Sequence, residues 1–197
     1  MINEQKERNV LTKMSDLEYT KNDLEMMRYR NNKLAYGLGL GGMAFAILAC
    51  FFELNSINAG SFNTMIIIAL NILILLGGFL GCEKTKNYSK GGCISLFVFA
   101  GVALSTMYNP IMIMNYFNAY RAGDESAKSF IGPSVYSAYE SSSTSSQGYF
   151  FASGNVRGVF IIIFLIASAA LFIAGGVIGY LRSKKLTDYL TSIGTKM

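Results

Sequence analysis

Histidine is absent from this chain of 197 residues. Its absence excludes Ser-His and Cys-His nucleophilic pairs, and it removes imidazole as a metal ligand. Within the apolar segments no two carboxylates are placed to face each other, and Asp124 and Glu125 are neighbours in a polar stretch. We therefore expect a protein without catalytic activity, without a cofactor and without a bound metal.

Charged residues are missing from the central part of four long apolar segments, which are residues 34–54, 63–82, 91–115 and 158–181. Each segment supplies the about 20 residues that a helix needs to cross about 30 Å of hydrocarbon. Hydrophobic residues make up 52% of the chain, and the mean hydropathy is +0.36. These values predict an all-α integral membrane protein with four transmembrane helices and no large soluble domain.

Lysine and arginine are distributed unevenly between the segments that join these spans. Of the 17 such residues, all but Arg121, Lys128 and Arg157 lie in the N-terminal tail, in the loop after the second span or in the C-terminal tail. Because positive residues accumulate in cytoplasmic segments, both termini are predicted to be cytoplasmic. The net charge of +5 then reflects topology, and we expect no nucleic-acid partner.

The predicted topology leaves all three cysteines outside the outer loops. No disulfide framework is therefore expected, which suits a bacterial plasma membrane, with a eukaryotic endomembrane as the open alternative. The chain divides into a cytoplasmic N-terminal helix or tail (1–33), the transmembrane domain (34–182) and a cytoplasmic C-terminal tail (183–197). The transmembrane domain carries one larger outer loop, residues 116–157.

The N-terminal region has apolar residues at helical spacing, and these are Val10, Met14, Leu17, Leu24 and Met27. They would form a thin apolar stripe on a helix that leads into the first span. Docking of this stripe onto a cytoplasmic partner, or disorder of the region, stays open. A further short helix is predicted in the outer loop around residues 124–130.

Glycine is concentrated in the halves of the spans that the charge pattern places inside. Three G-x-x-x-G pairs occur at matching depth, and a pair of alanines extends the last one: Gly37/Gly41, Gly77/Gly81, Gly175/Gly179 and Ala170/Ala174. Small residues let helices approach closely, so a bundle that is tightly packed near the inner face is predicted. Whether these faces pack within the chain or against an external helix stays open at this point.

Polar residues within the spans are few, and they are Asn71, Ser105, Thr106 and Asn109. A buried asparagine in a span typically forms an interhelical hydrogen bond, while a role in permeation is the alternative. Glu53 lies at the outer end of the first span, where we expect it to reach water. Pro110 should kink the third span because it cannot donate to the carbonyl group of Thr106.

These features favour a non-catalytic scaffold or accessory subunit of a larger membrane assembly, docked through the glycine-rich faces. The expected partners are membrane lipids, further membrane subunits in a homo- or hetero-oligomer, and a cytoplasmic protein at the N-terminal helix. A small solute transporter or channel with an outward-facing cavity is the alternative. A third hypothesis is a surface-interaction protein that uses the Ser- and Tyr-rich outer loop.

Overall fold

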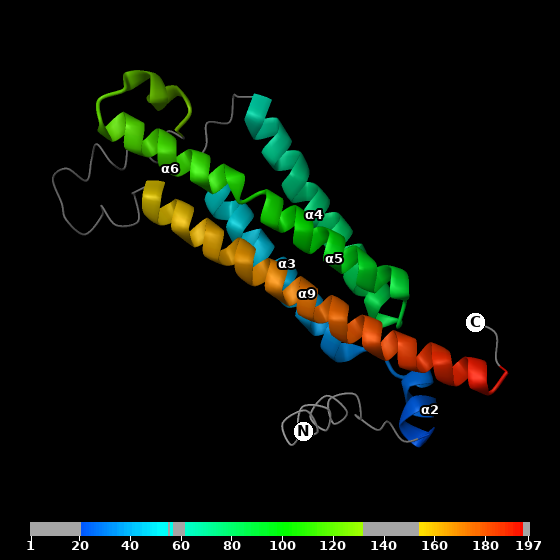
Figure 1. Ribbon diagram of the computed structural model, residues 1–197. Coiled ribbons are helices and arrows are strands. Elements are labelled where there is room, and N and C mark those ends of the chain that lie inside the picture. The colour runs from blue at the N-terminus through cyan, green and yellow to red at the C-terminus, as the bar shows by residue number, and fades with distance from the viewer. Residues whose placement is uncertain (1–20, 55, 57–61, 132–153, 195–197) are drawn as a thin grey trace, which may run out of the picture.

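The computed structural model describes residues 21–54, 56, 62–131 and 154–194, and these residues are almost entirely helical. Figure 1 shows the elements, which are α2 (Lys21–Tyr29), α3 (Lys33–Leu54), α4 (Phe62–Lys86), α5 (Lys90–Ser105), α6 (Tyr108–Arg121), the 3-10 helix η1 (Glu125–Ser129) and α9 (Gly154–Ser192). Four helical stretches are long and apolar enough to cross a membrane, namely Lys33–Leu54, Met65–Lys86, Lys90–Arg121 and Asn155–Ser192. The prediction of four spanning helices is confirmed at this level.

Two of the helices continue beyond their predicted ends. α6 runs to Arg121, so helix occupies the first residues of the segment predicted as an outer loop from residue 116. α9 has 39 residues and continues to Ser192, well into the segment predicted as a C-terminal tail from residue 183. Leu186 and Leu190 are buried on this extension, and their packing gives the helix a reason to continue past the apolar span.

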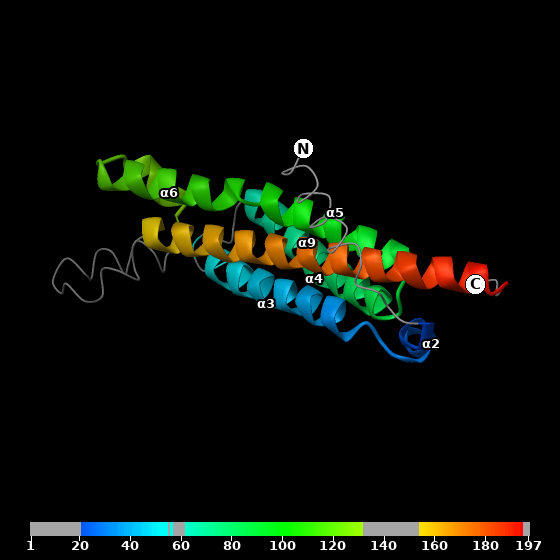
Figure 2. The same ribbon diagram turned by 60° about the horizontal axis from the view of Figure 1, so that its bottom comes forward.

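The helices form an elongated bundle in which α9 packs along both α3 and α5 (Figures 1 and 2). α4 packs against α3 and α5 and has little contact with α9. In Figure 1 the first turns of α4 diverge from the other helices, and Met65 on these turns is 68% exposed. The bundle is therefore less closely assembled where α4 begins.

The bundle has two distinct ends. We call the basic end the one where α2, the α4–α5 turn (residues 87–89) and the last turns of α9 meet (Figure 1). The far end is the one where α3 ends, α4 and α9 begin, and α6 leads into η1. Lysines and arginines surround the basic end, with Lys84, Lys86, Lys90, Arg182 and Lys184 on its helices.

At the basic end α2 packs against the C-terminal extension of α9. Met27 is buried against Leu186 and Leu190, and Leu24 lies beside them. The hydroxyl group of Tyr189 donates a hydrogen bond to Glu25 Oε1 at 2.8 Å. Two residues of the predicted apolar stripe thus contact the chain's own last helix, while Val10, Met14 and Leu17 lie outside the described residues.

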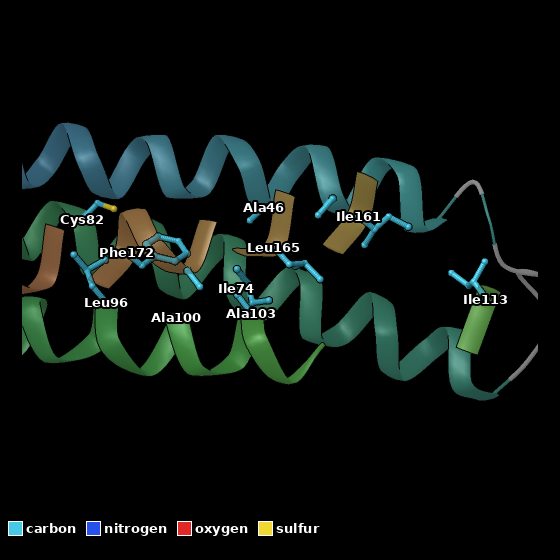
Figure 3. Packing of buried hydrophobic residues seen from close by; sticks show 12 residues of the cluster. Ala46, Ile74, Cys82, Leu96, Ala100, Ala103, Ile113, Ile161, Leu165 and Phe172 are labelled. Carbon is cyan, nitrogen blue, oxygen red and sulfur yellow. The ribbon is translucent and has the colours of Figure 1, made fainter. Parts of the chain in front are cut away.

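The main core combines small residues with a few large ones (Figure 3). Ile74, Leu96 and Phe172 are at most 1% exposed, and they lie among alanines from two helices, Ala46 on α3 and Ala100 and Ala103 on α5. A small residue on one helix leaves room for a large side chain of its neighbour, which fills the interior without gaps. This arrangement positions α3, α4, α5 and α9 along their inner faces.

The third span is broken between α5 and α6. α5 ends at Ser105, and α6 begins at Tyr108, two residues before Pro110. Pro110 has no N–H group for the carbonyl group of Thr106, which instead accepts a hydrogen bond from the Asn109 N–H at 3.0 Å. The chain therefore departs from helix just before Thr106 and not at Pro110 itself, and the offset of α6 from α5 is visible in Figure 1.

The predicted short helix around residues 124–130 is present as η1. Asp124 caps it, because its Oδ1 accepts hydrogen bonds from the backbone N–H of Ser126 at 3.0 Å and from the Ser126 hydroxyl group. These hydrogen bonds lower the pKa of the Asp124 carboxyl group below its ordinary value. Ala127 and Ile131 turn inward and tie this segment to α6.

Candidate functional site

A buried carboxylic acid lies near the far end of α3. Glu53 is 1% exposed, so the expectation that it reaches water is wrong. Its position follows from the register of α3, whose buried residues recur every three or four positions: Ala35, Gly39, Gly42, Ala46, Ala49 and Glu53. Residues at this spacing share one helix face, and Glu53 is the last member of the face that packs into the bundle.

Two asparagines from other helices face this carboxyl group. Asn71 on α4 is buried, and its Nδ2 donates a hydrogen bond to Glu53 Oε2 at 2.9 Å. The side chain of Asn109, at the start of α6, also faces Glu53. Glu53 Oε1 is fully buried and has no hydrogen-bond partner among the residues that the structure describes. The site thus joins α3, α4 and α6 through one acid and two amides.

The depth of this cluster can be gauged along the helices. Asn71 lies 13 residues before Lys84 and nine after Phe62, or about 20 Å and about 13 Å along α4 at about 1.5 Å per residue. Glu53 lies 19 residues after Leu34, or about 28 Å along α3. Both positions lie within helical stretches that are long and apolar enough to cross a membrane, and Glu53 is one residue before the end of its stretch.

Aromatic side chains close the side of the cluster that faces α9. Phe52, the neighbour of Glu53, has its ring centroid 6.1 Å from that of Phe160 and 5.8 Å from that of Phe164. Phe45 extends the group toward the basic end, with its centroid 6.0 Å from that of Phe164. These rings join α3 to α9 beside Glu53 and carry no charge.

The other polar residues predicted within the spans do not join this cluster by any hydrogen bond in the described part of the chain. Thr106 is buried and donates to the Ala103 carbonyl oxygen at 2.8 Å. Ser105 is exposed and donates to the Val102 carbonyl oxygen at 2.7 Å. Both hydroxyl groups therefore satisfy backbone carbonyls of their own helix, as serine and threonine commonly do in helices.

The glycines and alanines predicted for helix packing lie in different surroundings. A methyl group placed at Gly77 would clash with the Phe99 ring, and one at Gly81 would lie 2.6 Å from Ser95 Oγ. At Gly179 it would lie 2.8 Å from Cys93 Sγ, and at Gly175 3.1 Å from the Ala35 carbonyl oxygen. These four glycines lie in contacts between the chain's own helices.

Gly37 differs from the rest, because a methyl group there would meet no atom of the described chain within 4 Å. Gly41 is intermediate, because a methyl group placed there would lie 3.4 Å from Leu171 Cδ1. Ala170 is exposed and Ala174 half-buried on α9. Gly39 and Gly42 occupy the inner face of α3 instead, where the methyl group would lie 2.5 Å from Cys82 Sγ and 3.0 Å from Phe172 Cδ1.

The role of Glu53 was missed in the sequence, although a signal for it exists there. The series of small residues from Ala35 to Ala49 repeats at heptad-like spacing and leads directly to Glu53. A prediction based on G-x-x-x-G pairs selects Gly37 and Gly41, which lie on a different face of the same helix. Reading the longer repeat would have placed the acid on the buried face.

The cluster offers one acidic group, uncharged hydrogen-bond donors and apolar walls. Among the described residues, no three His, Cys, Asp or Glu side chains are grouped so that they could hold a metal ion. Such a site can take up and release a single positive charge at the buried carboxyl group. Comparisons with protein-family models, with curated proteins and with solved structures find no match to this chain.

Proposed function

We propose that this protein is a small membrane transporter or channel, with both termini in the cytoplasm of a bacterial cell, and that Glu53 lies on its translocation path. The observation that supports this proposal is the burial of Glu53 between α3, α4 and α6 with one oxygen atom left without a partner. Ionisable residues within a membrane are costly, and those that occur commonly mark ion or substrate pathways.

A purely structural role would not need an acid at this position. A glutamine could accept the same hydrogen bond from Asn71 and would carry no charge to be neutralised in an apolar interior. A buried ionised carboxylate without a cationic partner costs several kcal/mol. Glutamate differs from glutamine because its carboxylate can bind and release a positively charged ligand. A translocation path needs a group with this property.

The packing of the two ends supports the same proposal. Glycines at the basic end allow α3, α4, α5 and α9 to meet at van der Waals distance, as the contacts of Gly39, Gly175 and Gly179 show. Near the far end, the first turns of α4 diverge from the bundle (Figure 1), and the contact between α3 and α9 is made by bulky residues such as Phe52 and Phe160. We infer an arrangement that is closed at the basic end and opens toward the far end.

The test is flux into liposomes that contain the purified full-length protein. An imposed gradient of protons, Na⁺ or K⁺ is applied, and entry is followed with a trapped indicator for each ion. We expect flux above that of protein-free liposomes for at least one ion, and its loss in Glu53→Gln. The matched control is Glu125→Gln, which removes an exposed carboxylate on η1 and should leave the flux unchanged.

Two outcomes would overturn the transport proposal. One is an absence of flux for all three ions with correctly folded protein, judged by a symmetrical elution peak and by helical content. The other is equal flux in wild-type and Glu53→Gln protein. The second outcome would remove Glu53 from the path even if the protein conducts ions.

An accessory subunit of a larger assembly is the second candidate function, and one observation favours it. Gly37 and Ala170 are small residues that the described helices leave uncovered, so a helix of another subunit could approach α3 and α9 there. Native mass spectrometry after mild detergent extraction tests this candidate. A defined oligomer or a co-purifying subunit, lost in Gly37→Leu, is expected, and a strictly monomeric species would contradict it.

A further inference from the structure

We propose that the ligand of the Glu53 site is a proton, which binds to Glu53 Oε1, and that it arrives from the far end of the bundle. This inference names the chemistry of the proposed translocation path and rests on that proposal for its physiological role. It is carried by the charge of the site, by the room around the carboxyl group, by the direction of the hydrogen bonds and by the packing of the two ends.

The charge of the site matches a single positive charge. The polar side chains that face Glu53 in the described residues are Asn71 and Asn109, and both are neutral. The thiol group of Cys50, one turn earlier on α3, is the other titratable group close to the carboxyl group in this part of the chain. α9 presents aromatic rings beside Phe52 at this level. A divalent ion would leave an uncompensated charge in the apolar interior.

The room around Glu53 Oε1 also favours a proton. This atom is fully buried, and the whole residue is 1% exposed. A metal cation in a protein requires a shell of oxygen ligands to replace its water. A proton requires no cavity, because it forms an O–H bond with the carboxylate oxygen itself. Protonation turns the carboxylate into a neutral carboxylic acid, and release returns the proton to water.

The direction of the hydrogen bond from Asn71 leads to the same ligand. The amide group presents its Nδ2 donor to Glu53 Oε2, at 2.9 Å, so this oxygen already has a partner and Oε1 is the oxygen left to bind the proton. A cation site would instead need the Oδ1 acceptor turned toward the bound ion. The donor stabilises the carboxylate while the proton is absent, and it remains compatible with the acid when the proton is bound on Oε1.

The tight packing at the basic end indicates from which end of the bundle the proton reaches Glu53. Methyl groups placed at Gly39, Gly92 or Gly179 would all lie within 3 Å of atoms of a neighbouring segment, so these helices leave no gap for a water chain. Glu53 lies one residue before the end of α3 at the far end, so the shorter route to water leads to that end. Because Glu53 is 1% exposed, the proton exchanges with water at the far end only when the surrounding side chains move apart.

Infrared difference spectroscopy of the reconstituted full-length protein tests the inference. We expect a band of protonated carboxylic acid at neutral pH that is lost in Glu53→Gln and retained in Glu125→Gln. Saturating Na⁺ should leave the band unchanged. Absence of such a band at neutral pH, or its removal by Na⁺, would overturn the proton assignment. The removal by Na⁺ would identify a monovalent-cation site.

A second measurement covers the case in which Glu53→Gln does not fold. Dicyclohexylcarbodiimide modifies protonated carboxyl groups in apolar surroundings, and mass spectrometry of the wild-type protein identifies the modified residue without any variant. We expect modification of Glu53 and none of Glu125, and the reverse pattern would contradict the inference. The two proposals can fail separately. An infrared band of protonated carboxylic acid without ion flux would refute the transport proposal and leave the proton assignment intact. Na⁺-dependent flux without this band would refute the proton assignment and leave the transport proposal intact.

Discussion

Gly91 and Gly92 are neighbours in the first turn of α5, yet they lie in very different surroundings. A methyl group at Gly92 would lie 2.6 Å from the backbone nitrogen of Thr85 and 2.6 Å from Lys84 Cβ, on the last turns of α4. A methyl group at Gly91 would meet only Ser89 Oγ, at 3.7 Å, which is an ordinary contact. The pair therefore separates the effect of close helix packing from the general effect of replacing glycine in a helix.

The magnitude follows from two opposing terms. Replacing glycine by alanine favours a helix by up to about 1 kcal/mol, and this gain applies to both positions. Forcing an extra methyl group into a packed contact costs typically about 1–3 kcal/mol, and more where the neighbour cannot move. The neighbours of Gly92 include backbone atoms, so side-chain rotation cannot relieve the contact. We expect Gly92→Ala to destabilise the protein by about 1–3 kcal/mol and Gly91→Ala to be neutral or slightly stabilising.

The buried cysteines provide the assay. Cys82 and Cys93 are fully buried in the folded protein, so a thiol-reactive fluorogenic dye reports their exposure during thermal unfolding in detergent. Gly92→Ala should lower the unfolding temperature, whereas Gly91→Ala should leave it unchanged or raise it. Equal shifts in the two variants would refute the reasoning, because they would show that the close contact between α4 and α5 has no energetic consequence.

Three further predictions concern other contacts of the bundle. Asn71→Leu removes the donor to Glu53 Oε2 and should destabilise the protein by about 0.6–2 kcal/mol in the same dye assay, an expectation contradicted by an unchanged unfolding temperature. Leu186→Ala removes a buried contact of Met27 and should speed the hydrogen exchange of backbone amides in α2, while exchange in α4 stays unaffected. Unchanged exchange in α2 would contradict a stabilising role of this contact. Pro110→Ala restores an N–H group for the Thr106 carbonyl and should lengthen the distance between spin labels at the exposed positions 98 and 115, as α5 and α6 become one helix.

The number and approximate limits of the spans were predictable from the sequence because they follow from apolar length alone. The extensions of α6 and α9 were not, since they depend on tertiary contacts of residues such as Leu186 and Leu190 that no local pattern identifies. A kink caused by Pro110 was predicted, but the helix is interrupted already at Thr106, whose carbonyl group accepts a hydrogen bond from Asn109 in place of Pro110. Orientation in the membrane remains a prediction from the charge distribution.

Among the individual residues, Asn71 and Asn109 were recognised from their polarity, but their common partner was not. Glu53 looked like a residue at a helix end in contact with water, because a linear sequence does not show that α4 and α6 continue past it and cover it. The small residues on the same face of α3, which end at Ala49, carried this information. Their spacing identifies the buried face, and the next position on that face is occupied by an acid.

The glycines and the acid can be understood as two parts of one arrangement. Small residues at the basic end bring helices into contact at distances that exclude water, and they do so on the face of α3 that ends in Glu53. If all side chains on this face of α3 were small, the helices would be in close contact at the far end too, and Glu53 would have no route to solvent. Near Glu53 the contact between α3 and α9 is made by bulky side chains such as Phe52 and Phe160, and the first turns of α4, before Asn71, diverge from the other helices (Figure 1). Tight packing at the basic end thus leaves Glu53 with proton exchange from the far end only.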